Sequence, residues 1–244
     1  VIVTAPDGPR TICTAPSVQA AGLAECSNFP SAFCGNDYAA ARDLPPEVTA
    51  QVEAQMKAVG AWMAASSYRG VFGMDFMVRE GKVFPVEINP RFQNSTSLFN
   101  MVKALAGDPS EMLFALHAAE FLQSGDKKLR EYLRGVTGRG LMHPVRASQL
   151  ILHNRMKWST VTGPIQPGVY RYGREGLRRV RKGATLASCR STGEVLVTCG
   201  VPARGKVVEP NAPLCKLQRL DNFLDISNKR ELTEESRKIV TAVY

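Results

Sequence analysis

The sequence predicts an α+β fold in which an antiparallel sheet with helices is followed by a small β-rich barrel or sandwich domain. Between residues 46 and 70, apolar side chains recur at steps of three and four, the spacing of one helix face. Residues 73–89 hold two runs rich in Val, Phe and Ile around a polar turn, which predict a β-hairpin. Beyond residue 125 the chain changes to short β-like segments separated by Gly and Pro. We therefore expect two domains, 1–125 and 126–244.

The elements before the hairpin follow from local patterns. Residues 1–19 predict two strands joined at Asp7-Gly8, because this dipeptide between β-branched runs favours a hairpin turn. Residues 20–43 are rich in turn formers and are expected to be irregular. A helix is predicted to begin at Pro46, since proline suits the first helical turn, and to stop at Gly70. Its apolar stripe consists of Val48, Val52, Met56, Val59 and Met63.

The elements after the hairpin are predicted in the same way. Helices are expected over residues 95–105 and 110–123, and Ser110 can cap the second. A terminal helix is expected to start at Thr233. Short strands are predicted over residues 148–154, 158–165, 168–172, 185–189, 194–201, 206–209 and 213–220.

One group of polar residues on the predicted hairpin could bind a metal ion and a phosphate. Strand side chains alternate between faces, and pairing around the turn places Asp75 nearly opposite Glu87, with Asn89 on the same face. Two carboxylates and an amide oxygen suit Mg²⁺, which also takes substrate phosphates as ligands. Arg91 follows at once and can hold a phosphate oxygen. The alternative is a solvent-facing strand edge with ordinary charges.

These residues also carry a resemblance to a known family. Gly73-Met74-Asp75-Phe76, a short hairpin and then Glu87-Ile88-Asn89-Pro90-Arg91-Phe92 resemble the C-terminal core of the ATP-grasp superfamily. That family joins a carboxylate to a nucleophile through an acyl-phosphate, using ATP and Mg²⁺ (or Mn²⁺). The resemblance implies that Asp75, Glu87 and Asn89 bind metal, and that Arg91 is catalytic and contacts the transferred phosphate. It also implies that Met77 packs near the adenine, although a plain core position for Met77 stays open.

The C-terminal half resembles the β-rich C-terminal domain of biotin carboxylase, on the segments 147–150 and 208–214. Biotin carboxylase has R-x-Q-x-E where this chain has Arg91-Phe92-Gln93-Asn94-Ser95. A serine hydroxyl cannot replace the glutamate that deprotonates bicarbonate there. This departure favours a ligase that joins a small-molecule carboxylate to an amine, or less often a thiol. An enzyme of the biotin carboxylase or carbamoyl-phosphate type is the first alternative.

A second alternative is a basic module that binds a polyanion. The net charge is +9, and between residues 127 and 190 the only acidic residues are Glu131 and Glu175. The densest cluster is Arg174, Arg178, Arg179, Arg181 and Lys182. Few aromatic residues accompany this charge, so nucleic acid is not the expected partner.

Composition sets the remaining expectations. No apolar stretch approaches the roughly 20 residues of a membrane span, so no membrane partner is expected. The six cysteines form no CxxC pair, and reduced thiols in a cytoplasmic protein are expected. A homodimer is compatible with the sequence. The lysines and flexible loop with which ATP-grasp enzymes hold the nucleotide do not appear in the 244 residues. We therefore expect an N-terminal part upstream, and no ATP turnover by these residues alone.

Overall fold

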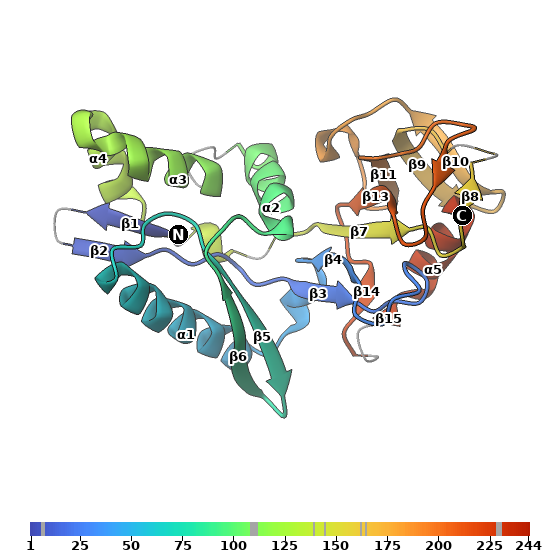
Figure 1. Cartoon of the computed structure of the whole chain (residues 1–244). Helices are drawn as coiled ribbons and strands as arrows, with labels where there is room; N and C mark the ends of the chain where they lie inside the picture. The colour runs from blue at the N-terminus through green and yellow to red at the C-terminus, as the bar shows by residue number, and fades with distance from the viewer. Residues whose placement is uncertain are drawn as a thin grey trace. The chain divides into compact units, whose positions relative to one another are not determined.

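The computed structural model describes residues 1–5, 8–107, 112–138, 140–143, 145–161, 163, 165–227 and 231–244. Within these ranges the fold is mixed, with five α-helices and mostly antiparallel strands (Figure 1). The chain forms two compact units. The hairpin unit comprises Val1–Pro16 and Leu44–Val145, and the sheet unit comprises Ser17–Asp43 and Arg146–Tyr244. The division therefore differs from the expected boundary after residue 125, and the sheet unit takes in an N-terminal segment.

The hairpin unit contains two antiparallel hairpins. Strand β1 (Ile2–Ala5) pairs with β2 (Gly8–Thr11), and β5 (Gly73–Arg79) pairs with β6 (Lys82–Asn89). Both hairpins were predicted, although Asp7 lies outside the described residues. Backbone hydrogen bonds of 2.9 Å in both directions join Ile2 to Gly70.

Helix α1 (Pro46–Ala65) begins at the predicted proline. Its Met63 packs with Ile2, Phe72 and Met74 in a buried cluster, so the predicted apolar stripe covers the hairpins. The helix ends before the predicted stop at Gly70, because Ser67 already adopts the left-handed conformation with a φ of 66°. Gly70 instead lies against the side chain of His117: a Cβ there would be 2.5 Å from the ring nitrogen Nδ1.

Three further helices complete the hairpin unit: α2 (Asn94–Leu105), α3 (Leu113–Leu122) and α4 (Lys127–Gly135), with short 3₁₀ turns at Gln123–Gly125 and Gly140–Met142. The first two were predicted, but α3 begins three residues later than expected, and Ser110, the expected cap, lies outside the described residues. Helix α4 was not predicted. The carboxylate of Asp126 caps it by accepting from the backbone N–H groups of Lys128 and Leu129.

The sheet unit is built on a seven-stranded antiparallel sheet with the order β10-β9-β11-β13-β7-β4-β3. Its strands are β3 (Val18–Ala21), β4 (Phe33–Asp37), β7 (Ser148–His153), β9 (Gly168–Gly173), β10 (Gly176–Arg181), β11 (Glu194–Thr198) and β13 (Pro213–Arg219). The described strands β10 and β3 form the two edges, so the sheet stays open. Of the two forms expected, barrel or sandwich, the barrel is therefore wrong for this part of the chain.

Short elements flank the large sheet. Strand β8 (Ser159–Thr160) pairs with β12 (Val207–Val208), and β14 (Leu224–Asp225) pairs with β15 (Glu231–Leu232). The 3₁₀ turns are Ala40–Asp43 and Leu186–Ser188. Helix α5 (Glu234–Val243) starts after the predicted cap Thr233, whose hydroxyl accepts from Ser236 N at 3.1 Å.

Two predictions in the sheet unit were wrong, and one strand was missed. Residues 20–43 are not irregular throughout, because β4 pairs with both β3 and β7. Residues 185–189 form a 3₁₀ turn instead of a strand. The arginine-rich strand β10 was missed, since its polar residues are typical of an exposed edge strand.

Candidate functional site: paired carboxylates on the β5–β6 hairpin

The register of the β5–β6 hairpin brings the predicted carboxylates together. Asp75 pairs directly with Glu87, as the sequence predicted, and Asn89 pairs with Gly73. A bulge follows, because the next pair is Phe76 with Pro85. Asp75 is half-buried and Glu87 is exposed.

Hydrogen bonds link the predicted site residues into a chain. The amide Nδ2 of Asn89 donates to Glu87 at 2.8 Å, and Nη2 of Arg91 donates to Asn89 Oδ1 at 3.1 Å. On the other strand, Nε2 of Gln93 donates to Asp75 Oδ1 at 3.3 Å. The pairing of Asp75 with Glu87 brings these two sets together, so the five side chains form one polar group at the end of the hairpin.

Gln93 is a member of this group that sequence reasoning gave no role. Its side chain lies over Gly73, where a Cβ would come within 2.0 Å of the amide carbon of Gln93. A residue with a side chain at position 73 would therefore displace Gln93 from Asp75. The sequence shows a glutamine two residues after Arg91. It does not show that this glutamine contacts Asp75, because that contact requires the absence of a side chain at Gly73.

The two carboxylates shift each other's protonation. Burial, and then the neighbouring carboxylate of Glu87, raise the pKa of Asp75, while Gln93 and Arg91 act in the opposite direction. The hydrogen bond from Asn89, and then the one shared with Asp75, lower the pKa of Glu87. Asp75 therefore holds its proton more tightly than an isolated aspartate does, and a cation placed between the two carboxylates would oppose this effect.

The donor set fits a hard divalent cation. The carboxylates of Asp75 and Glu87 and the amide oxygen of Asn89 are all oxygen donors, which Mg²⁺ and Mn²⁺ prefer. Among the described residues, no group of three or more His, Cys, Asp or Glu could hold a metal ion. Any metal on this hairpin would therefore depend on Asn89, whose oxygen now accepts from Arg91, and on substrate oxygens.

Met77 is not a core residue. It pairs with Phe84, and the two side chains are 63% and 49% exposed. The plain core reading of Met77 is therefore wrong. The contact of Met77 with adenine stays a prediction. The exposed side chains of Met77 and Phe84 form an apolar surface beside the carboxylates.

A row of rings next to Arg91 was not predicted. The ring centroid of Phe92 lies 5.1 Å from that of Phe114 and 4.8 Å from that of His117, which is in turn 4.9 Å from Phe121. Burial lowers the pKa of His117, whose Nδ1 accepts from Val71 N at 3.2 Å. The signal in the sequence was the spacing of positions 114, 117 and 121, which places them on one face of α3.

The basic stretch of the sheet unit is partly neutralised. Arg171 and Arg181 both bind the buried carboxylate of Glu194, the former at 3.1 Å. Arg178 pairs with Glu175 at 2.8 Å. These contacts indicate that much of the arginine cluster stabilises the strands that carry it, which weakens the argument for a polyanion-binding module.

The comparisons with family models and curated proteins identify no relative of this chain. No protein-family model matches the chain, and a search of curated proteins finds no significant match. Among the described residues, none of the helices combines the length and the apolar character needed to cross a membrane. The features that point to a function are therefore the geometry of the hairpin and the resemblance of its motif.

Proposed function

We propose that this chain carries the metal- and phosphate-binding part of an ATP-dependent ligase that joins a small-molecule carboxylate to an amine, or less often a thiol. The observation that carries the proposal is the direct pairing of Asp75 with Glu87, joined by hydrogen bonds to Asn89 and Arg91. The same four residues form the motif that resembles the ATP-grasp superfamily.

Each of these residues has a role in the proposed reaction. Asp75, Glu87 and Asn89 would hold Mg²⁺, which supplies positive charge that neutralises the phosphates of ATP. Arg91 is exposed and its guanidinium can bind two phosphate oxygens at once, which stabilises the charge on the transferred group. Gln93 positions Asp75 through its hydrogen bond.

The proposed reaction has two steps. The terminal phosphoryl group of ATP passes to a carboxylate oxygen of the substrate, which gives an acyl-phosphate and ADP. The nitrogen of the amine then attacks the acyl carbon, and inorganic phosphate leaves as the new bond forms and the nitrogen loses a proton. In this proposal Arg91 would contact the phosphate in both steps. The exposed Met77 offers an apolar contact for the adenine base.

The test is the effect of Glu87→Gln on ATP-dependent ligation. The experiment uses the protein as the cell makes it, a panel of carboxylates and amines, and ADP release together with mass detection of the coupled product. We expect Glu87→Gln to abolish product while the circular dichroism spectrum stays unchanged. Glu80→Gln is the matched control, because Glu80 is exposed in the turn of the same hairpin and contacts only Arg79 among the ion pairs found for the described residues. Near-normal turnover by Glu87→Gln would refute the assignment.

A further inference from the structure

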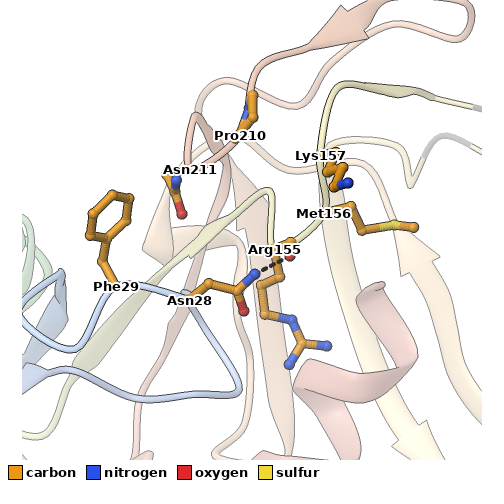
Figure 2. Close-up of a pocket in the computed structure, with 7 residues that line it drawn as sticks. All are labelled: Asn28, Phe29, Arg155, Met156, Lys157, Pro210 and Asn211. Atoms are coloured by element: carbon orange, nitrogen blue, oxygen red, sulfur yellow. Dashed lines mark hydrogen bonds between the residues drawn. The ribbon is translucent and has the colours of Figure 1, made fainter.

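A concave surface lies in the sheet unit, on elements that the proposed ligase site does not use. Its volume is about 350 Å³, and it is lined by three loops that contain Asn28 and Phe29, residues 155–157, and Pro210 with Asn211. Figure 2 shows Phe29 and Met156 on opposite sides of this hollow, with Asn28 and Arg155 between them. The lining of the hollow thus combines large apolar side chains with polar ones.

The buried residue Asn154 holds two of these loops in place. Its Nδ2 contacts the carbonyl oxygens of Val208 and Glu209 at 3.1 and 3.0 Å, and its Oδ1 accepts from Met156 N at 3.0 Å. Its own carbonyl accepts from Asn211 N at 2.8 Å. The amide of Asn28 ties the third loop to the carbonyl of Arg155. The hollow is therefore preformed by hydrogen bonds.

Two cations at the hollow form no ion pair with any described residue. The guanidinium of Arg155 donates to Ala24 O at 3.0 Å and lies 4.2 Å from the ring centroid of Tyr244. Lys157 is exposed. Among the described residues neither Arg155 nor Lys157 forms an ion pair, and no acidic side chain lines the hollow. The site therefore favours a ligand with negative charge.

The apolar side chains beside these cations are unusually open to solvent. Phe29 is 53% exposed, Met156 is 72% exposed and the neighbouring Trp158 is 65% exposed. Exposed Met and aromatic side chains are typical of surfaces that bind another protein. A ligand that satisfies the whole site would bring an apolar group together with carboxylates.

We propose that this hollow is a docking site for an acidic segment of a partner protein, with a large apolar side chain flanked by Asp or Glu. The apolar side chain would lie between Phe29 and Met156, and the carboxylates would meet Lys157 and Arg155. The charge of the site and its apolar walls argue for this occupant over a nucleic acid. A phosphate backbone needs a row of unpaired cations, whereas Arg171 and Arg181 of this unit already bind Glu194.

Trp158 directly follows the lining residue Lys157 in sequence, so its fluorescence can report binding. The chain has two tryptophans, and Trp62→Phe leaves Trp158 as the single reporter; Trp62 is itself 64% exposed, so its replacement disturbs no core. Trp158 fluorescence would be titrated with short synthetic peptides in which Asp or Glu flank a Leu or Phe. Parallel titrations use the same peptides with Asn and Gln in place of the acids, single-stranded oligonucleotides, and inorganic phosphate.

The expected result is saturable binding of the acidic peptides only, weakened about tenfold by Lys157→Glu and by Met156→Ser. The matched control is Lys182→Glu, which makes the same charge change at an exposed position of the same unit outside the hollow and should leave binding unchanged. The proposal is overturned if no peptide binds, if Lys157→Glu and Lys182→Glu weaken binding equally, or if oligonucleotides or phosphate bind as well as the acidic peptides. None of these outcomes bears on ligase activity.

Discussion

The Oδ2 atom of Asp37 accepts a hydrogen bond from the backbone N–H of Phe223 at 2.7 Å, although 186 residues separate them in sequence. The N–H of Leu224 donates to the same oxygen at 2.9 Å, and that of Ala40 donates to Oδ1 at 2.7 Å. Asp37 is 1% exposed. One buried carboxylate therefore joins the end of β4 to the loop after β13 within the sheet unit.

Asp37 should give the sheet unit a distinct pH dependence. Burial raises its pKa from 3.8 to about 6, against the effect of the backbone N–H donors around it. The folded state therefore binds this proton more tightly than the unfolded state, and the free energy of unfolding should fall as the pH rises from about 4 to about 6. We expect a change on the order of 2 kcal/mol.

Urea unfolding across this pH window, for the wild type and Asp37→Asn, measures the effect. Because Asn does not titrate, the substitution should remove this change of the unfolding free energy with pH. It should do so whatever stability it costs at any single pH. Parallel pH profiles for the two proteins would mean that Asp37 is not the titrating group.

Glu194 should be a second buried carboxylate on which the sheet depends. It is 1% exposed, binds Arg171 and Arg181, and accepts from the backbone N–H of Arg190 at 2.7 Å. Replacement by Ala leaves two guanidinium groups without their shared partner and should cost about 3 kcal/mol of unfolding free energy. Glu175→Ala, which breaks an exposed pair with Arg178, should cost less than about 1 kcal/mol. Equal losses in urea denaturation would contradict this role.

The hairpin that carries the candidate site could be predicted because its signals are local. The turn residues Glu80 and Gly81 both adopt positive φ angles, 53° and 74°, and the β-rich runs on either side fix the pairing of Asp75 with Glu87. The hydrogen bond from Gln93 could not be predicted, because it depends on the space above Gly73.

The sheet unit was harder to predict because its central pairing is not local. Strand β4 lies between β3 and β7, and β7 begins more than a hundred residues later in the chain. The short sequence Phe33–Asp37 contains Gly, Asn and Asp, which favour turns in isolation. Tertiary pairing overrides that preference, and periodicity along the chain does not reveal it.

Gly35 should be the residue that permits this pairing. Its φ is 138°, and a Cβ at this position would lie 2.0 Å from the carbonyl oxygen of Gln149 on β7. Gly35→Ala should therefore force the two strands apart and lower the unfolding free energy by about 3 kcal/mol. Gly193→Ala is the control in the same unit, since no atom of the described residues lies within 4 Å of its Cβ position. Thermal unfolding of both variants compares them, and a Gly35→Ala protein as stable as the control would contradict the close approach.

Metal binding at the β5–β6 hairpin should depend on both strands. Mn²⁺ can replace Mg²⁺ at oxygen-donor sites and is followed by its paramagnetic effect on water-proton relaxation. Asp75→Asn and Glu87→Gln should each weaken Mn²⁺ binding by more than about tenfold, because each removes a charged oxygen donor.

Gln93→Ala should weaken Mn²⁺ binding less than either carboxylate substitution, because Gln93 only orients Asp75 through a hydrogen bond of 3.3 Å. Glu80→Gln makes the same charge change as Glu87→Gln at the exposed turn, and it should leave the affinity unchanged. The ranking matters more than the absolute affinity. If Glu80→Gln weakened Mn²⁺ binding as much as Glu87→Gln, the ion would be attracted by the general charge of the hairpin, and the paired carboxylates would not form a site.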